Sequence, residues 1–117
     1  MPGEAVVLYG LKTCDTCRKA KRELLAAGKT VKFVDIRDDA DLPAKLPGWL
    51  KAAPDKLVNK SSATWRSLSN AEKAKAGTNG EKALLSAHPT LIKRPVIEAG
   101  GKVHVGWTKD VQAALLG

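Results

Sequence analysis

Residues 5–17 have the sequence Ala-Val-Val-Leu-Tyr-Gly-Leu-Lys-Thr-Cys-Asp-Thr-Cys, and they carry the strongest signal for the fold class. Residues 5–9 are a short apolar run, rich in β-branched and aromatic side chains, that ends at Gly10. Such a run is typical of a fully buried strand. Over residues 14–27 the apolar side chains recur at helical spacing, and Gly28 stops the pattern. We therefore predict a strand that leads into a helix through a loop carrying two cysteines.

The predicted helix is followed by a second strand. Ala20, Leu24 and Ala27 are spaced to lie on one helix face, which we predict to be buried, while mostly basic side chains cover the rest. Residues 31–36, Val-Lys-Phe-Val-Asp-Ile, alternate between apolar and polar side chains as a strand does. Strand, helix and strand form a βαβ unit, whose two strands should be parallel and joined by a right-handed crossover.

The middle of the chain, residues 38–91, is predicted to be a helical insertion because it contains no convincing strand pattern. Ser69 and Glu72 form a Ser-x-x-Glu signature, which is typical of a helix start. Residues 80–87 have the pattern of one more short helix before Pro89.

The C-terminal part returns to strands. Residues 95–98 and 102–105 flank an Ala-Gly-Gly turn and indicate a β-hairpin, and residues 108–116 have the pattern of a closing helix. The predicted inward side chains of that helix are Val111, Ala114 and Leu115. The order βαβ, helices, ββα predicts an α/β chain with a thioredoxin-like fold and an inserted helical segment. We expect one domain over residues 1–117.

Composition narrows the class of protein. The chain has 117 residues, 44% hydrophobic and 27% charged, which suits one globular domain. Its 20 Lys and Arg against 12 Asp and Glu give a net charge of +8, which favours anionic partners. Two cysteines are too few for a secreted disulfide framework. No membrane-length apolar run or signal-peptide pattern is present, so we expect a cytoplasmic protein that uses neither a membrane nor nucleic acid.

Cys14 and Cys17 form a CxxC motif after a predicted strand and at a predicted helix start, which is the context of a redox motif. The unpaired N–H groups and dipole of a first helical turn favour a thiolate at Cys14, and Lys12 and Arg18 add positive charge. Lowering a thiol pKa from about 8.5 to about 6.5 would raise its thiolate fraction at pH 7 about twentyfold. Cys17 should be less exposed and is placed to attack a mixed disulfide on Cys14.

The cysteine pair has two other interpretations. A structural zinc site would need two further ligands, and His88 and His104 do not follow a metal-ligand spacing, so we expect no metal. The other alternative is a pair of buried helix cysteines without chemistry.

Arg66 also has two interpretations: it pairs with a substrate carboxylate while the neighbouring tryptophan lines a groove, or it is a surface arginine.

Three segments resemble the arsenate reductase (ArsC) family. They are Val-Leu-Tyr-Gly-Leu-Lys-Thr-Cys-Asp-Thr-Cys-Arg-Lys-Ala at 7–20, Thr-Trp-Arg-Ser-Leu at 64–68, and Leu-Ile-Lys-Arg-Pro-Val-Ile at 91–97. Within the family they are similar to the YffB-like branch, which is related to the Spx and MgsR regulators. The resemblance implies a thioredoxin-like fold with a helical insertion. It also implies a cis peptide bond before Pro95, which would face the cysteine loop.

The arsenate-reducing members use one cysteine thiolate and three arginines that hold the oxyanion, and glutathione with glutaredoxin, or thioredoxin, completes the cycle. By position, the nucleophile is Cys14 and one arginine is Arg94. The other two arginines would fall near Asn59 and Gly106, which are not arginines here. Arsenate is a dianion that binds best to several bidentate donors, so the absence of two of the three arginines argues against arsenate as the substrate.

The resemblance therefore implies a glutathione-dependent thiol/disulfide oxidoreductase with no bound cofactor and with glutathione as co-substrate. The candidate protein partners are glutaredoxin and thioredoxin. The alternatives are an Spx-like redox-sensing regulator that binds RNA polymerase, and a true arsenate reductase. The expected catalytic residues are Cys14, Cys17 and Arg94. The expected substrate- or glutathione-binding residues are Lys12, Thr13, Arg66, Arg94 and Pro95.

Overall fold

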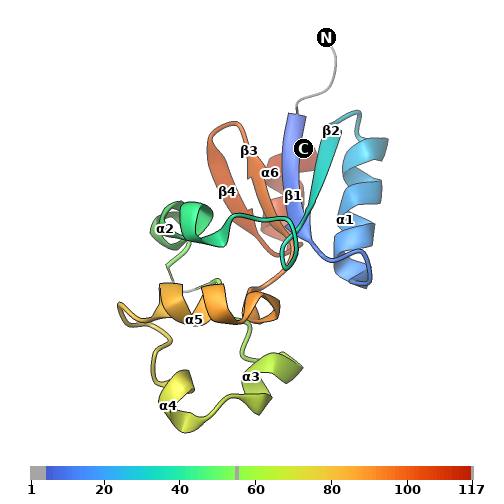
Figure 1. Ribbon diagram of the computed structural model, residues 1–117. Helices are drawn as coiled ribbons and strands as arrows, with labels where there is room; N and C mark the ends of the chain where they lie inside the picture. Colours follow the sequence, from blue (N-terminus) through green and yellow to red (C-terminus); the bar gives the residue numbers. More distant parts are fainter. Residues whose placement is uncertain (1–4, 55, 117) are drawn as a thin grey trace. The chain divides into compact units, whose positions relative to one another are not determined.

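The computed structural model describes residues 5–54 and 56–116 (Figure 1). The chain divides into two compact units: one combines the residues up to Ala40 with those from Arg94 onward, and the other spans Asp41–Lys93. Among the described residues, no helix combines the length and the apolar character that crossing a bilayer requires. The expectation of a single domain over the whole chain stays a prediction.

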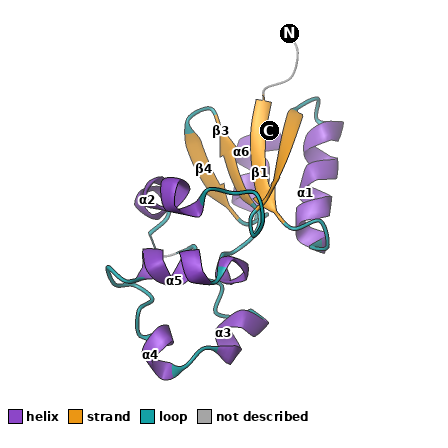
Figure 2. Ribbon diagram, in the orientation of Figure 1, coloured by secondary structure: helices purple, strands orange, loops and turns teal. Residues whose placement is uncertain are grey.

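The first unit is a four-stranded sheet with two helices (Figure 2). Its elements are β1 (Ala5–Gly10), α1 (Asp15–Ala26), β2 (Thr30–Asp35), β3 (Val96–Ala99), β4 (Lys102–Val105) and α6 (Lys109–Leu116). The strand order is β2-β1-β3-β4, in which β1 and β2 are parallel, while β3 is antiparallel to both β1 and β4. The predicted βαβ unit and hairpin are confirmed, and the fold is thioredoxin-like.

One face of this sheet and the two helices enclose an apolar core. Side chains alternate along a strand, so every second residue of β1 and β3 points to this face. The core side chains are Val6, Leu8, Ile97 and Ala99 of the sheet, Cys17, Ala20 and Leu24 of α1, and Val111 and Leu115 of α6. Full burial of one leucine side chain contributes about 1.5–3 kcal/mol to the free energy of folding. This packing therefore holds the start of α1 firmly against β1.

Two predicted core positions are wrong. Ala27 is exposed because α1 ends at Ala26, and Gly28 follows in the left-handed region with φ 85°. The buried stripe instead begins one turn earlier, with Cys17 as its first member. Ala114 is also exposed, because the buried face of α6 is too narrow to include it.

The second unit is helical. Its elements are α2 (Leu42–Ala52), α3 (Ala63–Ser67), α4 (Asn70–Lys73), α5 (Glu81–Ala87) and the 3-10 helix η1 (Pro89–Leu91). Helix α2 packs against α5, and η1 contacts α3 and α5. No strand occurs in the described part of 38–91, as predicted; Val58 forms only an isolated bridge with Ile92.

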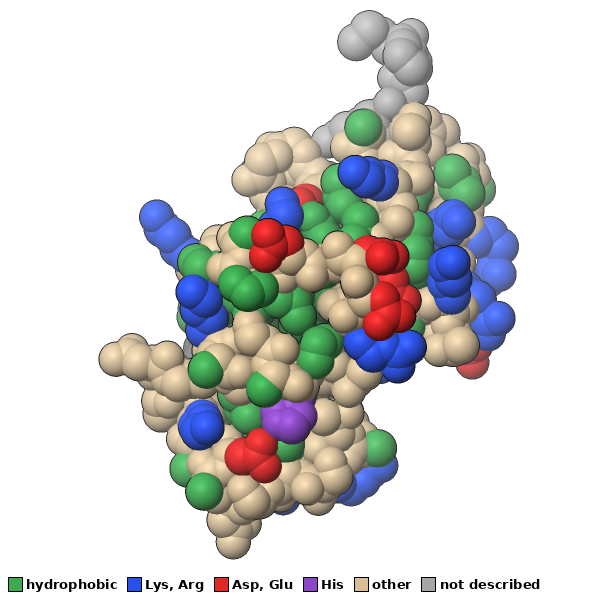
Figure 3. Space-filling model, viewed as in Figure 1, with side chains coloured by type: hydrophobic (Ala, Val, Ile, Leu, Met, Phe, Trp, Pro, Cys, Tyr) green, Lys and Arg blue, Asp and Glu red, His purple; other side chains and the backbone are tan. Residues whose placement is uncertain are grey.

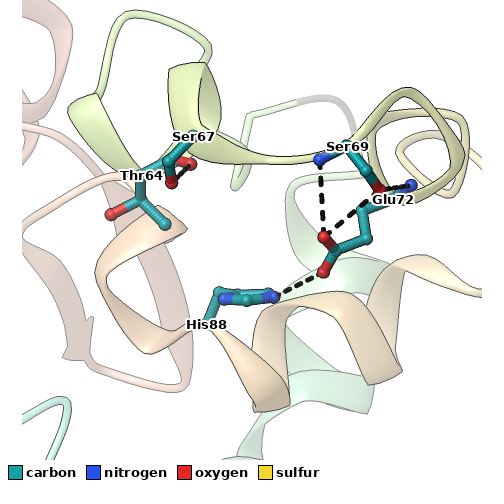
Figure 4. A network of polar contacts seen from close by, with 5 residues as sticks. All are labelled: Thr64, Ser67, Ser69, Glu72 and His88. Carbon is teal, nitrogen blue, oxygen red and sulfur yellow. Dashed lines mark hydrogen bonds and ion pairs between the residues drawn. The ribbon is translucent and has the colours of Figure 1, made fainter.

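A polar network joins α4 to the end of α5 (Figure 4). Ser69 Oγ accepts the Glu72 N–H at 3.1 Å, and Glu72 Oε1 accepts the Ser69 N–H at 3.4 Å, so the predicted capping box is present. Glu72 Oε2 also lies 2.8 Å from His88 Nε2. The hydrogen bond from His88, with the backbone N–H of Ser69, lowers the pKa of Glu72. This structural role of His88 is not visible in the sequence pattern.

Candidate active site

The loop between β1 and α1 places Cys14 directly before the first turn of a helix. Its N–H donates to the Leu11 carbonyl at 3.1 Å, which closes the loop, and its own carbonyl accepts the Arg18 N–H at 3.0 Å. Cys14 is partly exposed, whereas Cys17 is fully buried on the helix face that meets the sheet. The predicted difference in exposure between the two thiols is confirmed.

Several groups act on the ionisation of Cys14. Partial burial raises its pKa, but the backbone N–H and the thiol of Cys17 and the side chain of Arg94 together outweigh burial. Arg94 acts both through a hydrogen bond to the sulfur and through its charge. The pKa of Cys14 therefore lies below its ordinary value, which is the direction that a nucleophilic thiol requires.

The positive charge at the sulfur comes from a different residue than Arg18. Arg18 forms an ion pair with Asp15, and the two side chains are 61% and 91% exposed, so water and the carboxylate compensate the guanidinium. Lys12 and Thr13 are exposed in the loop, and their predicted contact with a substrate stays a prediction. The cation on which the pKa of Cys14 depends is Arg94.

Cys17 has the opposite character. Burial is the main cause that raises its pKa, a backbone hydrogen bond with Leu11 opposes the change, and the contact with Cys14 adds to the increase; together these effects raise the pKa of Cys17 to about 12. Cys17 therefore keeps its proton at neutral pH and presents an S–H group to the Cys14 sulfur. The motif thus contains one ionisable thiol and one hydrogen-bond donor.

Arg94 and Pro95 lie where β3 begins. The peptide bond between them is cis, as predicted. Pro95 is buried, and its carbonyl accepts the Gly106 N–H at 2.8 Å. The prediction that the Arg94 side chain faces Cys14 agrees with its effect on the sulfur.

The positions of the two missing arginines are occupied by residues with structural roles. Gly106 is buried and has φ 83°, a conformation that favours glycine, so an arginine there would be strained. Asn59 shapes its own loop: Oδ1 accepts the Ser61 N–H at 3.0 Å, and its N–H donates to the Leu91 carbonyl at 2.9 Å. Neither position therefore supplies a guanidinium that could bind an oxyanion.

Arg66 belongs to the second unit. It is exposed, and its Nη1 donates to the Ser61 carbonyl at 2.9 Å. The ring of Trp65 is half-buried, with the Nζ atoms of Lys60 and Lys73 at 5.6 and 5.7 Å from its centroid. These local contacts fit a surface arginine, and the pairing of Arg66 with a substrate carboxylate stays a prediction.

Two further observations bear on what the candidate site can bind. The described residues contain no group of three or more His, Cys, Asp or Glu side chains that could hold a metal ion. Lys and Arg side chains gather over the outer face of α1, where the cations of its first two turns are exposed (Figure 3). They are Arg18, Lys19, Lys21 and Arg22.

Comparison with known proteins identifies the family of this chain. The model of the ArsC family matches residues 9–115. An uncharacterised protein of Haemophilus influenzae is 38% identical over 111 residues, which are 93% of this chain and 97% of that protein. The solved structure of the YFFB (PA3664) protein is 35% identical with a TM-score of 0.81, covering 96% of this chain and 99% of that one. An arsenate reductase (ArsC) related protein from Brucella melitensis is 32% identical with a TM-score of 0.74, covering 93% and 92%. The chain therefore belongs to the ArsC family, a family of thiol-dependent reductases.

Proposed function

We propose that the protein is a thiol-dependent oxidoreductase that reduces mixed disulfides of glutathione, in a reducing compartment such as the cytoplasm. The observation that supports this most strongly is the contrast between the two thiols. The pKa of Cys14 is lowered, while that of Cys17 is raised to about 12. Of the two thiols, Cys14 is the one that is both partly exposed and has a lowered pKa, so it is the nucleophile in this proposal.

The reaction is written as two thiol–disulfide exchanges. The Cys14 thiolate attacks the glutathione sulfur of a mixed disulfide, forms a Cys14–glutathione disulfide and releases the substrate as a thiolate, which takes a proton from water. A glutathione thiolate then attacks the adduct, forms oxidised glutathione and returns Cys14 to its thiolate form. Two glutathionyl groups become one disulfide, and the substrate gains the two electrons.

The role of Cys17 in this scheme is to support the thiolate. Its S–H donates to the Cys14 sulfur, and its own deprotonation is unfavourable because the group is buried. A second glutathione, whose thiol is solvated, is therefore the better resolving nucleophile. Glutaredoxin or thioredoxin could supply the same electrons, and a turnover assay with each reductant separates these routes.

Arg94 is proposed to bind the substrate as well as the thiolate. A guanidinium can hold a carboxylate through two parallel hydrogen bonds, and glutathione carries two carboxylates. The basic outer face of α1 adds a favourable field for an anionic substrate. Arsenate is a weaker candidate, because Arg94 alone remains of the three arginine positions.

The test is a paired turnover assay with a glutathione mixed disulfide and with arsenate. The wild-type protein should reduce the mixed disulfide, Cys14→Ser should be inactive, and Cys17→Ser should keep measurable turnover. Turnover of arsenate without turnover of the mixed disulfide would contradict the proposal and would favour a true arsenate reductase.

A second candidate function is an Spx-like regulator that binds RNA polymerase in one redox state. The CxxC motif favours it, because oxidation of Cys14 and Cys17 to an intramolecular disulfide would provide the switch. Mass spectrometry of the oxidised protein should then show the loss of two hydrogens. Pull-downs from a lysate under oxidising and reducing conditions test the partner, and recovery of no polymerase subunit in either state would exclude this function.

A further inference from the structure

Gly10, the last residue of β1, lies against the buried sulfur of Cys17. A Cβ atom built on Gly10 would lie 2.5 Å from Cys17 Sγ, 3.1 Å from Cys17 Cβ and 3.3 Å from Leu8 Cδ2. The first of these distances is shorter than real Cβ contacts. Gly10 does not belong to the glycines with positive φ, so its backbone suits other residues as well. The requirement for glycine at this position is one of space.

The backbone at Gly10 has little freedom to move away from such a clash. Gly10 stands opposite Asp35 in the parallel pairing of β1 with β2, and its carbonyl accepts the Ile36 N–H at 2.9 Å. Cys17 lies in the buried stripe of α1, so its Cα is also held. The part that can move most easily is the Cys17 sulfur, by rotation about the Cα–Cβ bond.

We propose that Gly10 is a positioning residue. Because Gly10 has no side chain, it leaves the space that the Cys17 sulfur occupies when the Cys17 S–H group points at Cys14. A side chain at position 10 would turn the Cys17 sulfur out of this place and remove the donor from Cys14. The inference rests on the proposed function, in which the Cys14 thiolate is the nucleophile. It adds a residue outside the CxxC motif on which that thiolate depends.

The experiment is a double-mutant cycle with Gly10→Ala, Cys17→Ala and the double variant, all in the full chain. Two quantities are measured: the alkylation rate of Cys14 as a function of pH, and the thermal midpoint of unfolding. Cys17→Ala removes the atom at 2.5 Å and leaves the Cβ contact at 3.1 Å, which a shift of a few tenths of an ångström relieves.

Three results are expected. Gly10→Ala should slow the alkylation of Cys14 near neutral pH about two- to tenfold, the range that removal of one ordinary hydrogen bond gives. The double variant should alkylate like Cys17→Ala alone, because the donor is already absent. Gly10→Ala should also lower the thermal midpoint more in the wild-type background than in the Cys17→Ala background.

The outcomes decide between positioning and a general structural effect. Wild-type alkylation in a folded Gly10→Ala variant would overturn the proposal, as would a further slowing in the double variant. If Gly10→Ala does not fold and the double variant does, the sulfur is the obstacle, which supports the proposal; if neither folds, the proposal is wrong. The thermal midpoints of the four proteins report on the contact between Gly10 and Cys17 whatever the reactivity of Cys14. An ordinary thiol reactivity of Cys14 would refute the proposed function, but it would not change this result.

Discussion

Replacement of Arg94 by alanine is expected to weaken the candidate site in two measurable ways. The side chain donates a hydrogen bond to the Cys14 sulfur and places a positive charge beside it, and both effects lower the pKa of Cys14. Arg94→Ala should therefore raise this pKa, so that alkylation near neutral pH becomes slower while the limiting rate at high pH stays close to that of the wild type.

The size of the effect on binding follows from the type of hydrogen bond that Arg94→Ala removes. A hydrogen bond to a charged group contributes about 1.5–3 kcal/mol, which corresponds to an affinity about ten- to a hundredfold weaker. Glutathione binding, measured by calorimetry on Cys14→Ser to prevent reaction, should weaken by this factor when Arg94→Ala is added. Arg94→Lys keeps the charge but not the planar guanidinium, so its affinity for glutathione should lie between that of the protein with Arg94 and that of Arg94→Ala.

Arg18→Ala is the matched control for Arg94→Ala, because it removes the same charge from a residue four positions after Cys14. Arg18 is paired with Asp15 and largely exposed, so its removal should leave the alkylation profile of Cys14 unchanged. Equal effects of Arg94→Ala and Arg18→Ala would show that net charge alone matters. An unchanged Cys14 profile in Arg94→Ala would show that Arg94 does not lower the pKa of Cys14.

The remaining predictions concern other parts of the chain. Cys17→Ser should raise the pKa of Cys14 less than Cys17→Ala, because a hydroxyl still donates; alkylation titrations of both variants test this. Gly106→Arg should lower stability by about 1–2 kcal/mol, because φ is 83°, and a urea titration would contradict this if it showed no decrease. Because the pKa of Glu72 is lowered in the folded protein, its ionised carboxylate stabilises the fold. This stabilisation is fully present above the ordinary pKa of a glutamate, and it is lost as the pH falls through the lowered pKa. The thermal midpoint of Glu72→Gln should thus lie below that of the wild type at neutral pH and approach it in acid; a gap that is constant with pH would disprove the role of this carboxylate.

Much of the fold could be predicted because local signals agree with the tertiary structure. The apolar run before Gly10, the helical pattern of α1 and the Ser69–Glu72 signature each correspond to an observed element. The prediction failed at the end of α1, where Ala27 continued the helical spacing although the chain leaves the helix at Gly28. A periodic pattern shows which face is apolar but not where the helix ends.

The site was predictable in its main residue and less so in its surroundings. Cys14 could be identified from the CxxC motif at a helix start, and Arg94 only through a family resemblance, because it is distant in sequence. The contact of Gly10 with Cys17 depends on the packing of α1 on β1, which spacing does not reveal. One signal was present: Cys17, with the apolar residues three and seven positions later, forms the buried stripe that turns its sulfur toward the sheet.

A single turnover followed by mass spectrometry shows whether Cys14 is the thiolate that accepts a glutathionyl group. The protein is mixed in excess with a glutathione mixed disulfide in the absence of free glutathione, quenched with acid and digested. We expect one glutathionyl group on the peptide at Cys14 for each substrate thiol released, and no release by Cys14→Ser. A glutathionyl group attached first to Cys17, or release of the thiol by Cys14→Ser at the wild-type rate, would contradict it.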